Sequence, residues 1–441
     1  MAATRPHYGG VLQVQVHAQL ARLESGDAYE NWESGIVREE LIRLVYDRLT
    51  TVDESGRVLP QLAVSWEHSP DYRRWSFTIR KNVELHDGSQ LVPQFVATAL
   101  AEANRTWHLH ASGDKVTIDL DSPLAQLPET LASAKNSIIV RRMERLVGSG
   151  PFRLDSWQPG RLATFVAHDQ CWRGRPFLDG VQVQMGLAPS DQLLQLESRR
   201  ADIAEVSLDQ LRRAQQSNLR IQFSQPQDLY MLVFNPAALQ GPGLRDALSA
   251  AIDRNAIENA LLQKHGAAAG SLLPQWITGY ASLFPSARDL EQAQRLRRAL
   301  TNPPSINLVY DNSDPLARTI AERIALNARD AGITIRPSSS DLSRTGPADL
   351  KLVRIALLSA NPISDLQDII AQFGADSSGL SASELSDEQL YEQEYRLLRT
   401  LPVVPVAHVA RIVVASSRVH DGNVGKDGLW RFENLWIEGT P

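Results

Sequence analysis

Apolar and polar positions alternate in short runs over the N-terminal part of the chain. Alternation over residues 10–16 predicts an opening strand, and apolar positions three and four residues apart over residues 35–49 predict a helix after it. Further alternating runs, bounded by turn signals at Asp87-Gly88 and at residues 148–151, predict more strands. These runs cover residues 75–79, 115–120 and 163–167. The stretch before residue 189 is therefore expected to be rich in strands.

From residue 189 onward, helical spacing and strand-like runs take turns. Helices are predicted at residues 191–200, from Leu208, and at 243–263, 286–300 and 314–331; strands are predicted at 201–206, 230–234, 306–310 and 333–335. Such alternation predicts sheets covered by helices, with a boundary near Asn235-Pro236. Residues 337–349 and 374–386 are rich in Ser with Pro or Gly, so surface loops are predicted there.

Length and composition limit the possible classes of protein. The chain has 441 residues, which at roughly 150 residues per domain predicts two or three domains. Its 51 acidic and 45 basic side chains are interspersed, without the basic patch that a nucleic-acid surface needs. The single cysteine, Cys171, excludes an intrachain disulfide and is predicted to pack in the interior.

The sequence carries no signature of an enzyme, a cofactor site or a metal site. It has no His-Glu-x-x-His pair, no Gly-x-Ser-x-Gly elbow and no Walker-type phosphate loop. The most apolar stretch, residues 401–415, is interrupted by Pro402, Pro405, His408 and Arg411 and falls short of the roughly 20 apolar residues of a membrane span. We therefore expect a protein without catalysis, cofactor or metal.

Nine stretches occur in an order that carries a family resemblance over residues 9–436. They cover residues 44–49, 62–67, 75–80 followed by 85–88, 148–152, 171–179, 201–203, 234–235, 250–254 and 331–333. In this order the chain resembles the family 5 extracellular solute-binding proteins, the peptide, nickel and oligosaccharide receptors of ABC importers. Residues such as Asp87, Gly88 and Asp253 are interpreted as turn and helix-cap residues and not as ligand contacts.

The resemblance implies an α/β fold of the periplasmic-binding-protein type (type II, cluster C), with two lobes, a hinge and a strand-rich extension. By this reasoning, residues 8–46, 148–233 and 409–441 form the first lobe, 47–147 the extension and 234–408 the second lobe. Short segments at 103–115 and 128–147 predict a small extension. The implied function is capture of a small solute by a monomer that serves a cognate ABC permease. The implied location is the periplasm or the cell exterior, with lipid anchoring of a full-length precursor left open.

Six residues near the predicted lobe crossings are candidates for ligand contacts. Trp32 and Glu33 lie between the first strand and the first helix, a position that faces the cleft in this family, although an exposed loop is an equal alternative. Tyr230 and Asn235 flank the first predicted crossover strand. Trp276 could stack on a ligand or pack in the core. Arg354 could bind a ligand carboxylate through two parallel hydrogen bonds, which would make the ligand an anion.

One departure from the family pattern concerns the ligand. Peptide receptors of this family hold the α-ammonium of the peptide with an Asp in the second lobe, and Leu358 stands at that position here, with Asp365 and Asp368 a few residues further on as alternatives. Because a buried ammonium without a carboxylate is strongly disfavoured, a peptide with a free amino terminus is a doubtful ligand. Two alternatives to transport remain open: a ligand-sensing regulatory domain of the same fold, and a degenerate receptor.

Overall fold

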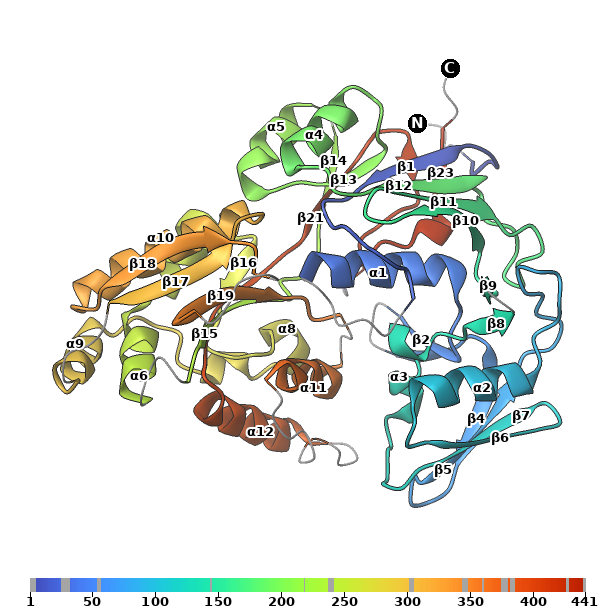
Figure 1. The fold of residues 1–441 in the computed structure, drawn as a ribbon, viewed down its shortest axis with the longest axis horizontal. Coiled ribbons are helices and arrows are strands. Elements are labelled where there is room, and N and C mark those ends of the chain that lie inside the picture. The colour runs from blue at the N-terminus through green and yellow to red at the C-terminus, as the bar shows by residue number, and fades with distance from the viewer. Residues whose placement is uncertain are drawn as a thin grey trace.

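The computed structural model describes residues 5–24, 32–53, 57–142, 145–217, 219–236, 242–300, 305–342, 348–358, 361–373, 380, 385–425 and 428–438, without the side chains of residues 32, 33 and 242. Two large sheets and one four-stranded sheet, each with its own helices, form most of the described structure, and three two-stranded sheets accompany them (Figure 1). This is the two-lobed α/β architecture with a strand-rich extension that the resemblance implies, and the predicted fold is confirmed. Within the described residues, no helix is both long and apolar enough to cross a membrane.

The first large sheet brings together strands from both ends and the middle of the chain. Its order is β10 (Phe152–Gln158), β11 (Leu162–Ala167), β12 (Gly180–Gln184), β1 (Val11–Gln15), β13 (Ile203–Glu205), β21 (Ile412–Ala415) and β14 (Arg220–Phe223). The predicted opening strand is thus central, paired in parallel with both β12 and β13. Helix α1 (Trp32–Val45) packs on one face, and α4 (Pro189–Glu197) and α5 (Leu211–Gln216) on the other.

Two glycines fix the C-terminal end of α1. A Cβ atom at Gly148 would lie 1.9 Å from the carbonyl oxygen of Val45, and one at Gly150 would lie 2.5 Å from that of Leu44, so only glycine allows this approach. The predicted bend at residues 148–151 therefore has a packing role. The predicted helix extended through residue 49, which is wrong by four residues because the chain turns away after Val45.

Asp47, just after α1, joins the first sheet to the strand-rich extension. Its carboxylate is wholly buried and accepts four hydrogen bonds from side chains. The donors are Gln61 Nε2 (2.9 Å), Ser149 Oγ (2.9 Å), Trp172 Nε1 (2.7 Å) and Arg173 Nη2 (2.8 Å). One carboxylate thus holds together segments that lie far apart in the sequence.

The extension is an antiparallel sheet covered by a helix. Its order is β4 (Ala63–His68), β5 (Arg74–Ile79), β7 (Lys115–Asp119) and β6 (His108–Ser112), with α2 (Pro93–Ala103) packed on it. Around it lie β2 (Thr50–Val52), β3 (Val58–Pro60), α3 (Leu127–Thr130), η1 (Ala134–Asn136), β8 (Val140–Arg142) and β9 (Arg145–Val147). Gly113, at a φ of +60°, allows the tight turn between β6 and β7. The short segment predicted at residues 103–115 contains the first strand and the turn of this hairpin.

The second large sheet lies between two layers of helices. Its order is β16 (Gly266–Ala268), β20 (Val403–Val409), β15 (Asp228–Phe234), β19 (Leu350–Ile355), β17 (Ile306–Asp311) and β18 (Ile335–Ser340). On one face pack α6 (Pro242–Ala251), α9 (Leu290–Arg298) and α10 (Pro315–Asp330); α11 (Pro362–Gln372) and α12 (Asp387–Thr400) pack on the other, where α8 (Gln275–Thr278) also lies (Figure 1). Strand β15 sends Tyr230 and Leu232 to the first layer and Leu229 and Met231 to the second. Burial on both faces explains its continuous apolar run.

Strand β20 is a central strand that the sequence analysis did not assign. All seven of its residues are buried, and it pairs with β15 and β16. Pro405 lies where the register with β15 shifts, and its carbonyl oxygen accepts a hydrogen bond from Arg254 Nε (3.0 Å). Proline cannot donate to a ladder, so a β-bulge is where a central strand tolerates it.

Three other elements differ from their predicted limits. The helix predicted over 243–263 is broken, because α6 ends at Ala251 and the side chain of Asp253 accepts a hydrogen bond from the Ala256 amide to start α7 (Arg254–Ala256). This confirms the cap predicted for Asp253. The helix predicted over 286–300 begins only at Leu290, after the Asp289 cap. The loop predicted over 337–349 is wrong at its start, because β18 pairs with β17 as far as Ser340.

The remaining short elements complete the two lobes. They are η2 (Leu208–Gln210), η3 (Ile257–Leu261), η4 (Ala281–Leu283), β22 (Val419–His420), η6 (Phe432–Asn434) and β23 (Trp436–Ile437). Residues 374–379 and 381–384 of the second predicted loop lie outside the described residues. Cys171 is buried, as predicted.

Glu394 of α12 is a buried carboxylate that makes stability depend on pH. It accepts hydrogen bonds from the amides of Leu272 (2.5 Å) and Leu273 (3.0 Å), and burial raises its pKa from 4.5 to about 7. Between these values the folded protein binds more protons at this site than the unfolded chain, so its contribution to stability is lost as the pH rises. We expect the ionisation of Glu394 to lower the free energy of unfolding by about 3 kcal/mol between pH 4.5 and pH 8. Urea denaturation at a series of pH values measures this loss.

Substitutions on the same helix isolate this effect. His408 has a pKa lowered by burial to about 4 and acts in the opposite direction over the acidic part of the range, so wild-type slopes alone are not sufficient. Glu394→Gln should flatten the loss of stability between pH 5 and pH 8, whereas Glu388→Gln, exposed at the start of α12, should leave it unchanged. Equal slopes in all three proteins would contradict the assignment.

Candidate functional site

Two short segments connect the two large sheets. Residues 224–227 run from β14 to β15, and residues 410–411 run from β20 to β21. They are hydrogen-bonded to each other, because the Ser224 amide donates to Arg411 O (3.0 Å) and the Arg411 amide to Ser224 Oγ (2.9 Å). The Gln227 amide donates to Val409 O at the end of β20 (3.1 Å). We call residues 224–227 and 410–411 the hinge.

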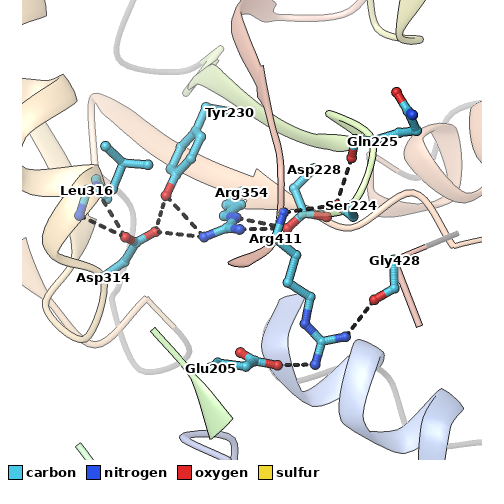
Figure 2. A network of polar contacts seen from close by, with 11 residues as sticks. Glu205, Ser224, Gln225, Asp228, Tyr230, Asp314, Leu316, Arg354, Arg411 and Gly428 are labelled. Carbon is cyan, nitrogen blue, oxygen red and sulfur yellow. Dashed lines mark hydrogen bonds and ion pairs between the residues drawn. The ribbon is translucent and has the colours of Figure 1, made fainter. Parts of the chain in front are cut away.

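Arg411 ties the hinge to the first lobe. Its side chain is 4% exposed, and Nη1 donates to Glu40 Oε1 of α1 (2.8 Å). Nη1 also donates to Gly428 O (2.9 Å), and Nη2 donates to Glu205 at the end of β13 (Figure 2). Burial alone would lower the pKa of Arg411, but the carboxylates of Glu205 and Glu40 outweigh it and raise the pKa. Arg411 is therefore a buried, charged side chain that connects the hinge to α1 and β13 of the first lobe.

Arg354 and Tyr230 form the matching cluster on the second lobe. Arg354 Nε and Nη2 both donate to Asp228 Oδ2, at 3.1 and 2.7 Å, and its guanidinium carbon lies 5.4 Å from the centre of the Tyr230 ring. The Tyr230 hydroxyl donates to Asp314 Oδ2, whose other oxygen caps α10 by accepting from the Leu316 (3.0 Å) and Ala317 (3.2 Å) amides. Figure 2 shows both clusters side by side at the hinge.

Two carboxylates of these clusters, Asp228 and Glu40, are held at an electrostatic cost. Burial raises the pKa of Asp228 despite the attraction of Arg354, and burial likewise raises the pKa of Glu40 against the attraction of Arg411. For Arg354, burial opposes the charge, but Tyr230, Asp228 and Asp314 together raise its pKa. The guanidinium groups are thus firmly charged.

The structure brings two of the six predicted ligand contacts together. Tyr230 and Arg354 lie on adjacent strands in register, with Arg354 Nη1 3.5 Å from the Tyr230 hydroxyl oxygen. Tyr230 is wholly buried and hydrogen-bonded, and the guanidinium of Arg354 is engaged by Asp228, so both are occupied within the protein.

The other predicted contacts are spread around this cluster. Trp276 is half-buried in α8, and its Nε1 donates to Pro226 O of the hinge (2.9 Å). Asn235, half-buried, follows β15, and its amide donates to Asp349 O (3.0 Å) at the far end of that strand from the hinge. The backbone of Trp32 and Glu33 forms the first turn of α1, but their side chains lie outside the described part of the structure. All six remain predictions as ligand contacts.

Leu358, the residue predicted to replace the ammonium-binding Asp, is half-buried three residues after β19. Sequence reasoning missed the four carboxylates of the hinge clusters and Arg411. A usable signal was present: Arg411 interrupts the most apolar stretch of the chain, and Asp228 is the first residue of an otherwise apolar strand. A charge inside such a run is rarely buried unless it is paired.

The family model confirms the resemblance. Residues 57–354 match the model described as bacterial extracellular solute-binding proteins, family 5 middle. Because the match covers more than half of the chain, this protein belongs to family 5 of the bacterial extracellular solute-binding proteins.

Curated relatives are similar over part of their length. The probable D,D-dipeptide-binding periplasmic protein DdpA of Escherichia coli is 26% identical over 327 residues, covering 67% of this chain and 63% of DdpA. The nickel-binding periplasmic protein of Escherichia coli is 25% identical over 344 residues, covering 66% of this chain and 65% of that protein. The chain thus spans less than two thirds of the length of these relatives.

Solved structures share the whole fold. A dipeptide-binding protein from Pseudoalteromonas sp. SM9913 in complex with Met-Leu superposes with a TM-score of 0.83 at 17% identity, covering 98% of this chain and 100% of that one. NikA from Staphylococcus aureus in complex with Ni(L-His)2 gives 0.80 at 19% identity, covering 97% and 100%. At these identities the similarity establishes the fold.

Proposed function

We propose that this protein is the solute-binding component of an ABC importer, which captures a small solute between its two lobes. In this role it acts as a monomer, in the periplasm or outside the cell, and delivers the solute to a cognate ABC permease. Binding is its whole activity, without catalysis or cofactor.

The observation that carries the proposal is the hinge. Two hydrogen-bonded segments, residues 224–227 and 410–411, are the covalent links between two α/β lobes, so rotation about them changes the separation of the lobes. Family membership and relatives named for dipeptide and nickel binding support the same role. Polar groups from both lobes meet beside this hinge, as expected for a site that closes around a solute.

A thermal-shift screen tests the proposal. The panel contains di- and tripeptides, N-blocked peptides, oligosaccharides, carboxylates, polyamines and nickel chelates. A ligand at a hundred times its dissociation constant stabilises the folded state by about 2.7 kcal/mol, so one class should raise the melting temperature by several degrees.

Two variants link the shift to the space between the lobes. Trp276→Ala should weaken the response, because it removes the ring beside the hinge, and Trp66→Ala, on the extension, is the matched control. Absence of any shift over the whole panel would contradict a receptor role. Stabilisation by peptides with free amino termini would instead show that Leu358 does not exclude them.

A further inference from the structure

The hinge clusters contain more negative than positive groups. Asp228, Asp314, Glu40 and Glu205 supply four carboxylates, and Arg354 and Arg411 supply two guanidinium groups. A network of this kind, largely removed from water, gains from any further positive charge placed against it.

Arg354 does not offer a free charge to an anionic solute. Two of its nitrogens donate to Asp228, and a third lies 4.0 Å from Asp314 Oδ2. Binding a ligand carboxylate here would require separating the Arg354–Asp228 pair and leaving Asp228 buried without its partner, which is costly. This argues against the anionic ligand predicted from the sequence.

Asp228 supplies an independent sign of a missing donor. Its side chain is wholly buried, and Oδ1 has no hydrogen-bond partner among the described residues, although Oδ2 accepts twice from Arg354. A buried carboxylate oxygen without a donor is rare, because it loses its hydration without compensation. The network is in contact with solvent at its edges, because the side chains of Arg354 and Glu205 are 11% and 19% exposed.

We propose that the solute held between the lobes carries a primary amine or guanidinium group, which Asp228 and Asp314 bind beside Arg354. The proposal rests on the receptor function and names its ligand class, a compact cation. The ammonium donates to Asp228 Oδ1 and offsets the excess of carboxylates. It uses acceptors of the hinge and α10 in place of the position that Leu358 occupies.

Calorimetric titration of the wild-type protein with putrescine, agmatine and glutarate tests the ligand class directly. We expect the two cations to bind at least tenfold more tightly than glutarate, which has a similar length and the opposite charge. Tighter binding of glutarate would overturn the proposal.

Two asparagine variants test the residues. Asp228→Asn removes the charge at constant size, and Asp314→Asn does so while keeping an oxygen that caps α10, so this second variant should fold even where the first does not. Each should weaken cation binding at least tenfold. Asp289→Asn, the same change at the cap of α9 and away from the hinge, is the control and should bind like wild type.

The outcomes separate this proposal from the receptor function. Cation binding that both hinge variants leave unchanged would overturn the assignment to Asp228 and Asp314. Binding of a neutral or anionic solute with no response to cations would overturn the cation class and leave the receptor function standing. No binding of any solute would overturn both.

Discussion

Replacing Asp47 with alanine is expected to lower the free energy of unfolding by about 4 kcal/mol, measured by urea denaturation. The carboxylate accepts four hydrogen bonds, and its loss leaves three neutral donors without an acceptor and Arg173 without its counter-charge. The Arg173 side chain is 32% exposed and regains part of its hydration, so most of the loss comes from the three neutral donors, at about 1 kcal/mol or more for each donor left without an acceptor.

Two comparisons show whether burial is the cause. Asp119→Ala breaks the exposed pair with Arg74, whose side chain is 68% exposed, and should cost at most about 1 kcal/mol. Ser149→Ala removes one neutral donor to Asp47 and should cost about 1 kcal/mol. If Asp47→Ala costs no more than Asp119→Ala, the joint between the first lobe and the extension does not depend on this carboxylate.

Replacing Arg411 with methionine is expected to destabilise the protein by about 3–5 kcal/mol, because Glu40 and Glu205 lose their counter-charge while Glu40 stays buried. Methionine preserves most of the side-chain volume, so the loss reports on charge and hydrogen bonds more than on packing. Denaturant unfolding of the wild type and the variant measures the difference.

Neutralising the two carboxylates that lose Arg411 as their partner provides the decisive comparison. Adding Glu40→Gln and Glu205→Gln to Arg411→Met should recover more than half of the lost stability, since a network replaced as a whole is much cheaper than one broken from one side. Arg213→Met, which breaks an exposed pair with Glu197, should cost at most about 1 kcal/mol. A triple variant less stable than Arg411→Met alone would contradict the account.

Local pattern was sufficient for most elements. The alternation at residues 10–16 becomes β1, and the apolar runs at 230–234 and 306–310 become β15 and β17. Helix α10 matches residues 314–331 closely, because Asp314 caps it and apolar residues recur on one face. In such segments the local propensity and the tertiary environment favour the same structure.

Elements that depend on partners far away in the sequence were harder to predict. Strand β20 contains two residues unfavourable to a buried strand, Pro405 and the ionisable His408. It forms because β15 and β16 pair with it on both sides. The break after Ala251 and the extension of β18 to Ser340 likewise depend on contacts that no sequence window contains.

The candidate site follows the same division. The sequence singled out Tyr230 because it flanks a predicted crossover strand, and Arg354 because its guanidinium group could bind a ligand carboxylate. It could not show that Asp228 engages Arg354 or that Arg411 reaches Glu40, 371 positions away. The ligand charge that we propose from the structure is therefore opposite to the one expected from the sequence.

The sequence by itself determined the two-lobed class, the family and the main strands and helices, because hydrophobic periodicity and ordered motifs are local properties of the chain. Only the tertiary structure decided which charges are buried, which are paired and which buried carboxylate oxygens lack a donor among the described residues. The physical reason is that the energy of a charge depends on solvent exclusion and on partners within a few ångströms, and both are set by residues far apart in the sequence.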